Sequence, residues 1–321
     1  MKKALIVGGA GFVGNYLIDH IQKNCIWSIV VTKLPHEKIE KDGIRILDLD
    51  ITNQEAIQKV LDETEPDYIF HLAAQSSVGL SWKNPGLTVD VNIKGTLCLL
   101  EALRQSNRSP RILLIGSGEE YGYILPSETP IKEDTVLRPG NIYAATKACQ
   151  NMIGSIYARA YQMDILMVRA FNHIGPGQAP LFVVADFCRQ VAEIEAGRRE
   201  PIMMVGNLSA KRDFTDVRDV VSAYCMLMEK GKSGVTYNVG SGKAIAIQRL
   251  LDEILSLSLK EIRVEVDKSR LRPSDVPIIE ADIEKLYEDT GWCPEYSLKE
   301  TLQDTLNDWR RITEMGEGRC R

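Results

Sequence analysis

Short apolar runs alternate with stretches of helical periodicity through the first half of the chain. The runs at 4–7, 27–31, 45–47, 68–70, 111–115 and 165–168 each have the length of a buried strand. Between them, Tyr16, Leu17, Ile18 and Ile21 repeat at helical spacing, and residues 52–55 fit a capping box that opens a helix. Long helices are predicted near 90–105 and 141–161. This alternation is typical of an α/β fold, a doubly wound parallel sheet with helices on both faces.

The pattern changes after Phe171. Residues 172–177 are rich in turn-forming types, and the later helices and short strands alternate less regularly. A further strand-like run near 236–240 predicts a return to the first sheet. We therefore expect a first domain at 1–170 and 217–241, a smaller α/β lobe at 171–216 and 242–313, and a flexible polar tail at 314–321.

Composition indicates a soluble globular protein. Of 321 residues, 44% are hydrophobic and 26% charged, and no apolar run approaches the roughly 18 residues of a membrane span. The first apolar run breaks at Gly8, which is too early for a secretion signal. We therefore expect a cytoplasmic protein without a membrane anchor.

The cysteines and the net charge exclude several kinds of site. The seven cysteines are scattered from Cys25 to Cys320 without a C-x-x-C pair, so neither a disulfide framework nor a metal site is expected. A net charge of −5 offers no basic surface for nucleic acid. A phosphate-bearing ligand would therefore need a local cluster of arginines.

A glycine-rich turn follows the first apolar run and precedes the first helix. Glycines at 8, 9, 11 and 14 let the backbone turn sharply and approach a pyrophosphate, while the helix directs its free N–H groups at the anion. The glycines alone fit a tight turn equally well. Their place between a strand and a helix favours a dinucleotide cradle.

Tyr143, Lys147 and Ser117 are the candidate catalytic residues. Tyr143 and Lys147 are four apart on a predicted helix, so an ammonium beside the phenol is expected to lower the phenol pKa. Ser117 follows a buried strand and has the place of a hydrogen-bond donor to a substrate oxygen. Taken alone, a Tyr-x-x-x-Lys pair is also typical of a solvated helix face.

In this order, the glycine turn, the serine and Tyr-x-x-x-Lys resemble the short-chain dehydrogenase/reductase family, in its extended form that acts on nucleotide sugars. The resemblance reaches to about Trp309 and implies a Rossmann fold. It implies that Tyr143 exchanges a proton with the substrate, that Lys147 holds the nicotinamide ribose, and that Ser117 polarises the carbonyl. The other cofactor-binding residues that it implies are Gly8, Gly11, Phe12, Val13, Gly14, Asp50, Ile51, Leu72, Ala73, Ala74, Gln75, His173 and Ile174.

The end of the second predicted strand bears on the choice of cofactor. An acidic residue about 20 residues after the glycine turn would bind a ribose 2′-hydroxyl. Thr32 and Lys33 occupy that place, and no carboxylate is present there to repel a 2′-phosphate. NADP(H) is therefore predicted over NAD(H), with NAD(H) as a tolerated alternative.

Segments of the second lobe narrow the substrate. Four segments resemble the branch of the family that reduces the C4 ketone of GDP-4-keto-6-deoxy-D-mannose. These segments are 169–178, 205–208, 212–214 and 272–277. The resemblance implies that Arg212 and Arg272 bind the diphosphate, because guanidinium groups match phosphate oxygens. It adds Ser76, Ser117, Glu119, Asn172 and Asp275 as substrate-binding residues. It also implies a homodimer formed through the helices near 90–105 and 141–161.

Two other functions are compatible with the same motifs. GDP-mannose 4,6-dehydration uses a glutamate where Glu119 stands, but a threonine is expected there in place of Ser117 and a lysine in place of Asp186. A non-catalytic NADP(H) or nucleotide-sugar sensor would not need the serine, tyrosine and lysine together. Reduction to GDP-D-rhamnose is therefore the expected activity, with the C4 configuration taken from the resemblance.

Overall fold

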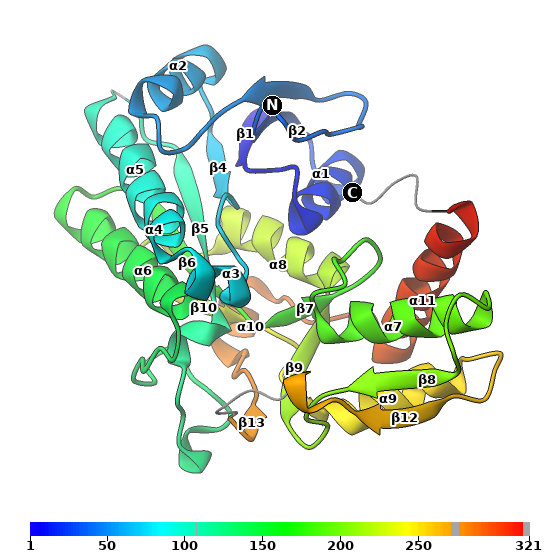
Figure 1. The fold of residues 1–321 in the computed structure, drawn as a ribbon. Coiled ribbons are helices and arrows are strands. Elements are labelled where there is room, and N and C mark those ends of the chain that lie inside the picture. The colour runs from blue at the N-terminus through cyan, green and yellow to red at the C-terminus, as the bar shows by residue number, and fades with distance from the viewer. Residues whose placement is uncertain (107, 271–275, 317–321) are drawn as a thin grey trace.

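A seven-stranded parallel sheet forms the centre of the first domain in the computed structural model, which describes residues 1–106, 108–270 and 276–316 (Figure 1). All six strands expected in the first half are confirmed, and the segment near 236–240 joins them as the edge strand. The strands are β1 (Lys2–Val7), β2 (Trp27–Lys33), β3 (Arg45–Asp48), β4 (Tyr68–His71), β5 (Arg111–Ser117), β6 (Ile165–Ala170) and β10 (Thr236–Val239).

The strand order places the glycine turn at the point where the sheet reverses direction. The order is β10-β6-β5-β4-β1-β2-β3, so the chain moves one way from β1 to β3 and the other way from β4 onward. Loops that leave β1 and β4 therefore diverge and open a crevice at the carboxyl edge of the sheet. The doubly wound α/β fold is thus confirmed, and its crevice lies directly after Val7.

Helices cover both faces of this sheet. The side chains of β1 point alternately to the two faces, and both faces are buried, so the whole run is apolar. Ala4 and Ile6 pack on the side of α1 (Phe12–Asn24) and α8 (Val217–Lys230). Leu5 and Val7 pack on the opposite side, and successive strand residues point to opposite faces. That side is covered by α2 (Gln54–Thr64), α5 (Gly95–Gln105) and α6 (Ile142–Ala160).

Two local predictions on this face are corrected. Asn53 caps α2 by accepting the Ala56 amide at 3.0 Å, whereas the predicted cap, Thr52, donates to Asp50. The helix expected over 90–105 begins with a π-helical turn at Asp90–Lys94 before α5. The remaining short helices are α3 (Val78–Lys83), α4 (Pro85–Val89) and the 3₁₀ turns Gly118–Tyr121, Pro126–Glu128 and Lys268–Arg270.

The second lobe has a core of its own. A small sheet combines β7 (Asn172–Ile174), β9 (Lys211–Asp216), β11 (Ala244–Ala246) and β13 (Ile278–Ile279), and β8 (Ile202–Val205) pairs with β12 (Arg263–Val266). Apolar faces of α7 (Val183–Glu195), α9 (Ile247–Ser256) and α11 (Leu298–Met315) pack together beside them. Because α11 continues to Met315, residues 314 and 315 are helical and do not belong to the expected tail, and residues 317–321 lie outside the described residues.

One segment assigned to the lobe by sequence lies elsewhere. Leu286, on α10 (Glu284–Thr290), and Trp292 belong to the apolar core that contains α1 and α8 of the first domain. Trp292 also donates its indole N–H to the backbone oxygen of Asp219 at 3.2 Å. Because these two side chains are buried in the core of the first domain, the segment belongs to that domain and not to the second lobe.

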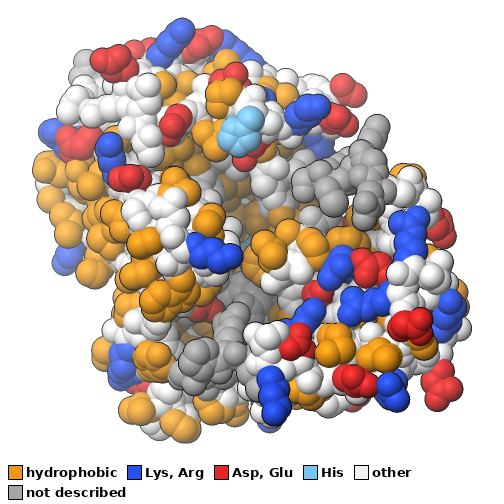
Figure 2. All heavy atoms as spheres, in the orientation of Figure 1, with side chains coloured by type: hydrophobic (Ala, Val, Ile, Leu, Met, Phe, Trp, Pro, Cys, Tyr) orange, Lys and Arg blue, Asp and Glu red, His pale blue; other side chains and the backbone are white. Residues whose placement is uncertain are grey.

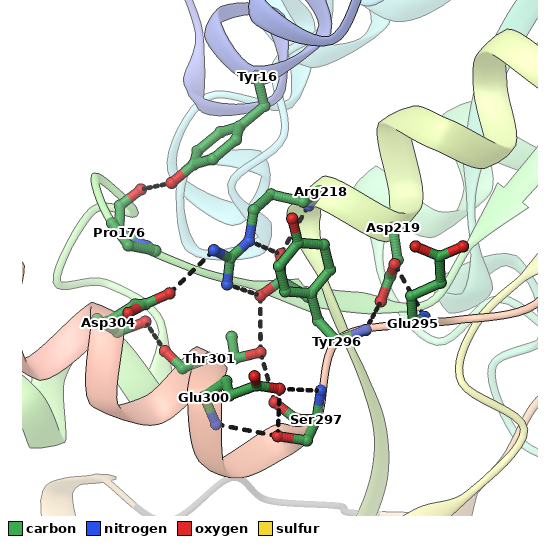
Figure 3. Close-up of polar contacts among 12 residues, drawn as sticks. Tyr16, Pro176, Arg218, Asp219, Glu295, Tyr296, Ser297, Glu300, Thr301 and Asp304 are labelled. Atoms are coloured by element: carbon green, nitrogen blue, oxygen red, sulfur yellow. Dashed lines mark hydrogen bonds and ion pairs between the residues drawn. The ribbon is translucent and has the colours of Figure 1, made fainter. Parts of the chain in front are cut away.

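A charged cluster joins the two units where α8 begins, and Figure 3 shows it in detail. The Arg218 guanidinium binds both oxygens of Asp216, at 2.9 and 2.7 Å, and one oxygen of Asp304 on α11 at 2.9 Å. It also lies over the Tyr296 ring, 3.8 Å from the centroid. We call Asp216, Arg218, Tyr296, Thr301 and Asp304 the junction cluster.

Within residues 1–106, 108–270 and 276–316, no helix is both long and apolar enough to cross a bilayer.

Candidate active site

The glycine turn has the geometry of an anion cradle. Gly8 has φ +80°, and a Cβ there would lie 2.6 Å from the Ala73 Cα, so a larger residue fits neither the backbone nor the space. Gly11 is the N-cap of α1, and no described heavy atom lies within 4 Å of where its Cβ would be. The space beside Gly11 is therefore open at the N-terminal, positive end of α1, which fits a dinucleotide pyrophosphate.

The two residues predicted to select the cofactor differ in their availability. Thr32 is 1% exposed, and its hydroxyl accepts the Gly8 amide at 3.3 Å, so it supports the turn from below. Lys33 donates to Asp48 at 2.6 Å. The expectation that no carboxylate lies at this site is therefore wrong, because parallel pairing of β2 with β3 places Asp48 opposite Lys33.

The segments predicted to flank the adenine and the riboses line the same edge. Asp50 is exposed and accepts the Thr52 amide at 2.9 Å, and Ile51 is buried against Gly95. After β4, the amides of Leu72 and Ala73 both donate to the Val7 oxygen, which holds this strand exit beside the glycine turn. Ala74 is half-buried and Ser76 is exposed at the same exit.

Gln75 is committed to the scaffold. Its side-chain amide donates to the Thr88 hydroxyl at 3.0 Å and to the Ser77 oxygen at 3.1 Å, and its backbone amide donates to Asn92. The Gln75 side chain therefore shapes the loop after β4, and its contact with the cofactor stays a prediction.

Ser117, Tyr143 and Lys147 meet beside this crevice. Ser117 ends β5, Tyr143 and Lys147 lie one turn apart on α6, and all three are less than 10% exposed. Asn141 caps α6 by accepting the Ala144 amide at 2.8 Å, which sets where the first turn begins. The Lys147 ammonium donates to the Ile115 backbone oxygen at 2.7 Å and to Gln150 at 3.0 Å. Two of its three N–H groups are thereby used.

The charge state of the tyrosine differs from the prediction. Burial raises the pKa of the Tyr143 phenol to about 12; a hydrogen bond with Ser117 lowers it, and the charges of Glu119 and Glu120 raise it. The Lys147 ammonium was expected to lower the pKa of Tyr143, but burial of the phenol outweighs such an effect. Lys147 is itself desolvated, and its ammonium donates to the Ile115 oxygen. Burial lowers the pKa of Lys147 to about 8, against the opposing charge of Glu120.

Residues from the second lobe border the same space. Asn172 is exposed on β7, and the His173 ring stacks on Phe12 with centroids 6.1 Å apart. Phe12 and the half-buried Val13 open α1, so the His173 ring connects β7 to the start of this helix. Ile174 is buried in the apolar core of the second lobe. A Cβ on Gly14 would lie 2.3 Å from the Gly9 oxygen, which keeps this turn tight. Glu119 accepts from the Asn141 side chain at 3.2 Å.

The predicted diphosphate ligands are described only in part. Arg212 on β9 donates to the Val276 oxygen at 2.7 Å and so holds the strand that leads to β13. Arg272 and Asp275 lie outside the described residues. Asp186, discussed above as the alternative to a dehydratase lysine, binds Arg189 at 2.7 Å and Arg270 at 2.6 Å.

Three buried polar residues around Ser117 escaped the sequence analysis. Asn151 and Arg169 each donate a hydrogen bond to the Glu120 carboxylate, which lies directly behind Ser117. A signal for Asn151 exists, because 143, 147 and 151 repeat every four residues on one helix face. Nothing local links Glu120 to Arg169, which is 49 positions away.

Comparisons with known proteins agree with this geometry. The family described as GDP-mannose 4,6 dehydratase matches residues 5–305. The GDP-6-deoxy-D-mannose reductase of Pseudomonas aeruginosa is 31% identical over 96% of this chain and 97% of its own length.

Two solved structures extend the comparison. The structure of RMD from P. aeruginosa complexed with NADPH has a TM-score of 0.87 at 31% identity and covers 97% of this chain and 99% of its own. The UDP-glucose 4-epimerase of Thermus thermophilus in complex with NAD has a TM-score of 0.85 at 27% identity, covering 96% and 99%. The cradle and the Ser-Tyr-Lys set therefore lie in a fold that binds nicotinamide cofactors in these relatives.

The match covers nearly all of the sheet, the crevice and the second lobe, and the chain belongs to the GDP-mannose 4,6-dehydratase family of extended short-chain dehydrogenases/reductases.

Proposed function

We propose that the protein reduces the C4 ketone of GDP-4-keto-6-deoxy-D-mannose to give GDP-D-rhamnose. The observation that carries the proposal is that Ser117, Tyr143 and Lys147 are all buried beside the crevice, with the Tyr143 phenol in hydrogen-bond contact with Ser117. A tyrosine phenol, with an ordinary pKa of about 10, is protonated at neutral pH. A protonated phenol is the form that a reduction needs, because the oxygen of the ketone gains a proton. Similarity to the GDP-6-deoxy-D-mannose reductase of P. aeruginosa supports the same substrate.

Each residue of the site has a role in this reaction. The reduced nicotinamide, when bound, supplies the hydride that C4 receives. Ser117 donates a hydrogen bond to the C4 oxygen, and Tyr143 transfers its proton to that oxygen as the C–H bond forms. Lys147 retains one N–H for a ribose hydroxyl, since Ile115 and Gln150 accept the other two. The amides at the start of α1 hold the pyrophosphate.

Two residues argue against dehydration as the main activity. Ser117 stands where a dehydratase is expected to carry a threonine, and Asp186 stands where a dehydratase lysine is expected. Asp186 is instead paired with Arg189 and Arg270. Dehydration stays an outcome of the test below, because the Glu119 carboxylate borders the site.

A spectrophotometric assay with product analysis tests the proposal. With GDP-4-keto-6-deoxy-D-mannose, we expect one NADPH consumed per keto sugar and GDP-D-rhamnose as the product. With GDP-mannose, release of a keto sugar without net change in cofactor would instead establish a dehydratase. Absence of both reactions, with tight binding of nucleotide, would identify a sensor.

Lys147 is expected to set the alkaline limit of activity. Its ammonium is charged below the pKa of about 8 and neutral above it, so binding of the ribose weakens as the pH rises. The value of kcat/KM should therefore fall about tenfold per pH unit above pH 8. In K147R the side chain stays charged, so the profile should be flat to pH 10 at a lower level. If kcat/KM of K147R still fell above pH 8, the titrating group would be one other than Lys147.

We propose a preference for NADP(H), with Lys33 as the residue that binds the 2′-phosphate. The NADPH complex of the P. aeruginosa relative supports this choice. Because Lys33 is paired with Asp48, the phosphate has to compete with that carboxylate. We expect D48N to raise the preference for NADPH over NADH about 3–10-fold and K33M to lower it by a similar factor, since both groups are partly exposed. The measurement is kcat/KM with NADPH and with NADH. If both variants kept the wild-type preference, Lys33 and Asp48 would be excluded as the residues that select the cofactor.

We propose that the enzyme is a cytoplasmic homodimer. Figure 2 shows apolar side chains gathered on the side of the molecule where α4 and α6 lie, among them Leu87, Val89, Met152 and Ile156, each more than 40% exposed. A second copy would cover these side chains. All cysteines in the described ranges are free thiols, which fits a reducing compartment. Light scattering should give twice the chain mass.

A further inference from the structure

A fully buried carboxylate lies directly behind Ser117. Glu120 is 0% exposed, and its Oε1 accepts the backbone amide of Ser117 at 2.8 Å. Ser117 in turn accepts the Glu119 amide through its hydroxyl at 3.2 Å, so that side chain and backbone form a reciprocal cap on this turn. The position of the Ser117 backbone therefore depends on the Glu120 side chain.

The same carboxylate connects this turn to α6. Asn151 donates to both Glu120 oxygens at 2.9 Å, and it lies on the helix face that carries Tyr143 and Lys147. Gly116 makes room for the arrangement, because a Cβ there would lie 2.2 Å from Glu120 Oε1 and 2.5 Å from Asn151 Nδ2. One acidic group thus holds the end of β5 against the helix that supplies the phenol.

Arg169 completes the surroundings of Glu120. Its Nε donates to Oε2 at 2.9 Å, and its NH1 donates to the Tyr121 hydroxyl and to the Glu133 backbone oxygen. Every partner of Glu120 is a donor, so an ionised carboxylate is fully satisfied. Burial raises the pKa of Glu120, and Arg169, Ser117 and Asn151 oppose that shift.

Energetics favour a positional role over a purely stabilising one. Removal of two charges from water costs several kcal/mol per ion, and a buried pair is often no more stable than apolar side chains of similar size. The Glu120–Arg169 pair lies beside the reacting groups, and one Glu120 oxygen accepts the Ser117 amide. Its presence there is explained by the position that it gives to Ser117.

We propose that Glu120 is a positioning residue of the reductase, which holds Ser117 in reach of the Tyr143 phenol by binding the Ser117 amide and Asn151 on α6. The inference rests on the proposed reduction and deepens it. Charged and titratable groups face this carboxylate from three elements, namely Arg169 on β6, Tyr143 and Lys147 on α6, and Tyr121 on its own turn.

E120D and E120Q separate the reach of the side chain from its charge. Aspartate retains the charge but is too short to keep the Ser117 amide and Asn151 together. Glutamine has the reach, but its NH₂ group must face one of the donors. We expect kcat to fall about 10–100-fold in both variants, while KM for the GDP sugar and the Kd for NADPH stay within twofold.

The pH profile distinguishes the variants from each other. The Glu120 charge raises the pKa of both Tyr143 and Lys147, so its removal in E120Q should move the alkaline limb of kcat/KM to lower pH. In E120D the limb should stay in place. Y121F is the matched control, because Tyr121 shares the Arg169 network without contacting Ser117; its kcat and pH profile should match the wild type.

Amide hydrogen exchange at Ser117, followed by NMR, tests the inference without any substrate. Exchange should be slow in the wild type and Y121F and at least tenfold faster in a folded E120D or E120Q. Rapid exchange in the wild type would overturn the inference even if neither variant folds. An unchanged kcat or unchanged exchange in a folded variant would overturn it as well, as would an equal loss of kcat in Y121F. A wild type that does not reduce the keto sugar would refute the proposed function instead, and the exchange measurement would still decide the role of Glu120.

Discussion

Substitution of Tyr143 by phenylalanine is expected to lower kcat by about 10²–10⁴-fold, which is the usual contribution of a positioned proton donor. The change removes one buried hydroxyl and leaves the buried ring in place. Because the glycine turn and Lys33 are untouched, the Kd for NADPH should stay within a few-fold of the wild-type value. Stopped-flow measurement of a single turnover with the keto sugar separates this loss from slow product release.

Tyr157 provides a matched control for Tyr143. It lies on the same helix, and its hydroxyl donates to Glu101 on α5, away from the crevice. Y157F should therefore retain wild-type kcat. Near-normal turnover in Y143F, or an equal loss in Y157F, would contradict the assignment of Tyr143 as the proton donor.

The second large effect concerns stability and the junction cluster in Figure 3. Replacement of Arg218 by alanine is expected to lower the free energy of unfolding by about 2–4 kcal/mol. The Asp216 side chain is 0% exposed, and without the guanidinium its partners among the described residues would be the Thr301 hydroxyl and the Arg218 backbone amide. The variant also loses the contact of Arg218 with Tyr296 and its ion pair with Asp304.

An ion pair on α11 with an exposed arginine provides the comparison. Arg311 pairs with Asp308 three residues away, and the Arg311 side chain is 67% exposed whereas that of Asp308 is 10% exposed. R311A should lower the free energy of unfolding by less than about 1 kcal/mol, because solvent screens the Arg311 charge and Asp308 keeps the Gly177 amide as a donor. Urea denaturation of both variants at pH 7 measures the difference. A loss in R218A no greater than in R311A would show that the junction cluster contributes no more than a surface pair.

Local chemistry explains why much of the fold was predictable. The strands of the sheet are buried on both faces, so each appears as a continuous apolar run, and the glycine turn needs φ +80° at Gly8 whatever surrounds it. Tyr143 and Lys147 share a face through helical spacing alone. These features depend on residues that are neighbours in the chain.

Pairings across the chain were not predictable from such patterns. Asp48 reaches Lys33 because two strands lie in parallel register, and this changes the expected environment of a 2′-phosphate. The cap of α2 is a separate, local error of one residue, because Asn53 and not Thr52 accepts the Ala56 amide. Packing of Trp292 against α8 moved part of the second lobe into the first domain's core.

The sequence by itself determined the parallel sheet, the crevice after β1, and the serine, tyrosine and lysine that lie beside it, because spacing and apolar runs are local properties. Only the tertiary structure decided the direction in which the Tyr143 pKa shifts, which depends on burial, and the direction of the Lys147 ammonium, which donates to the Ile115 oxygen. It also placed Glu120 between Ser117 and Asn151. Burial and long-range partners determine the charge state of a site, and neither is visible in the spacing of its residues.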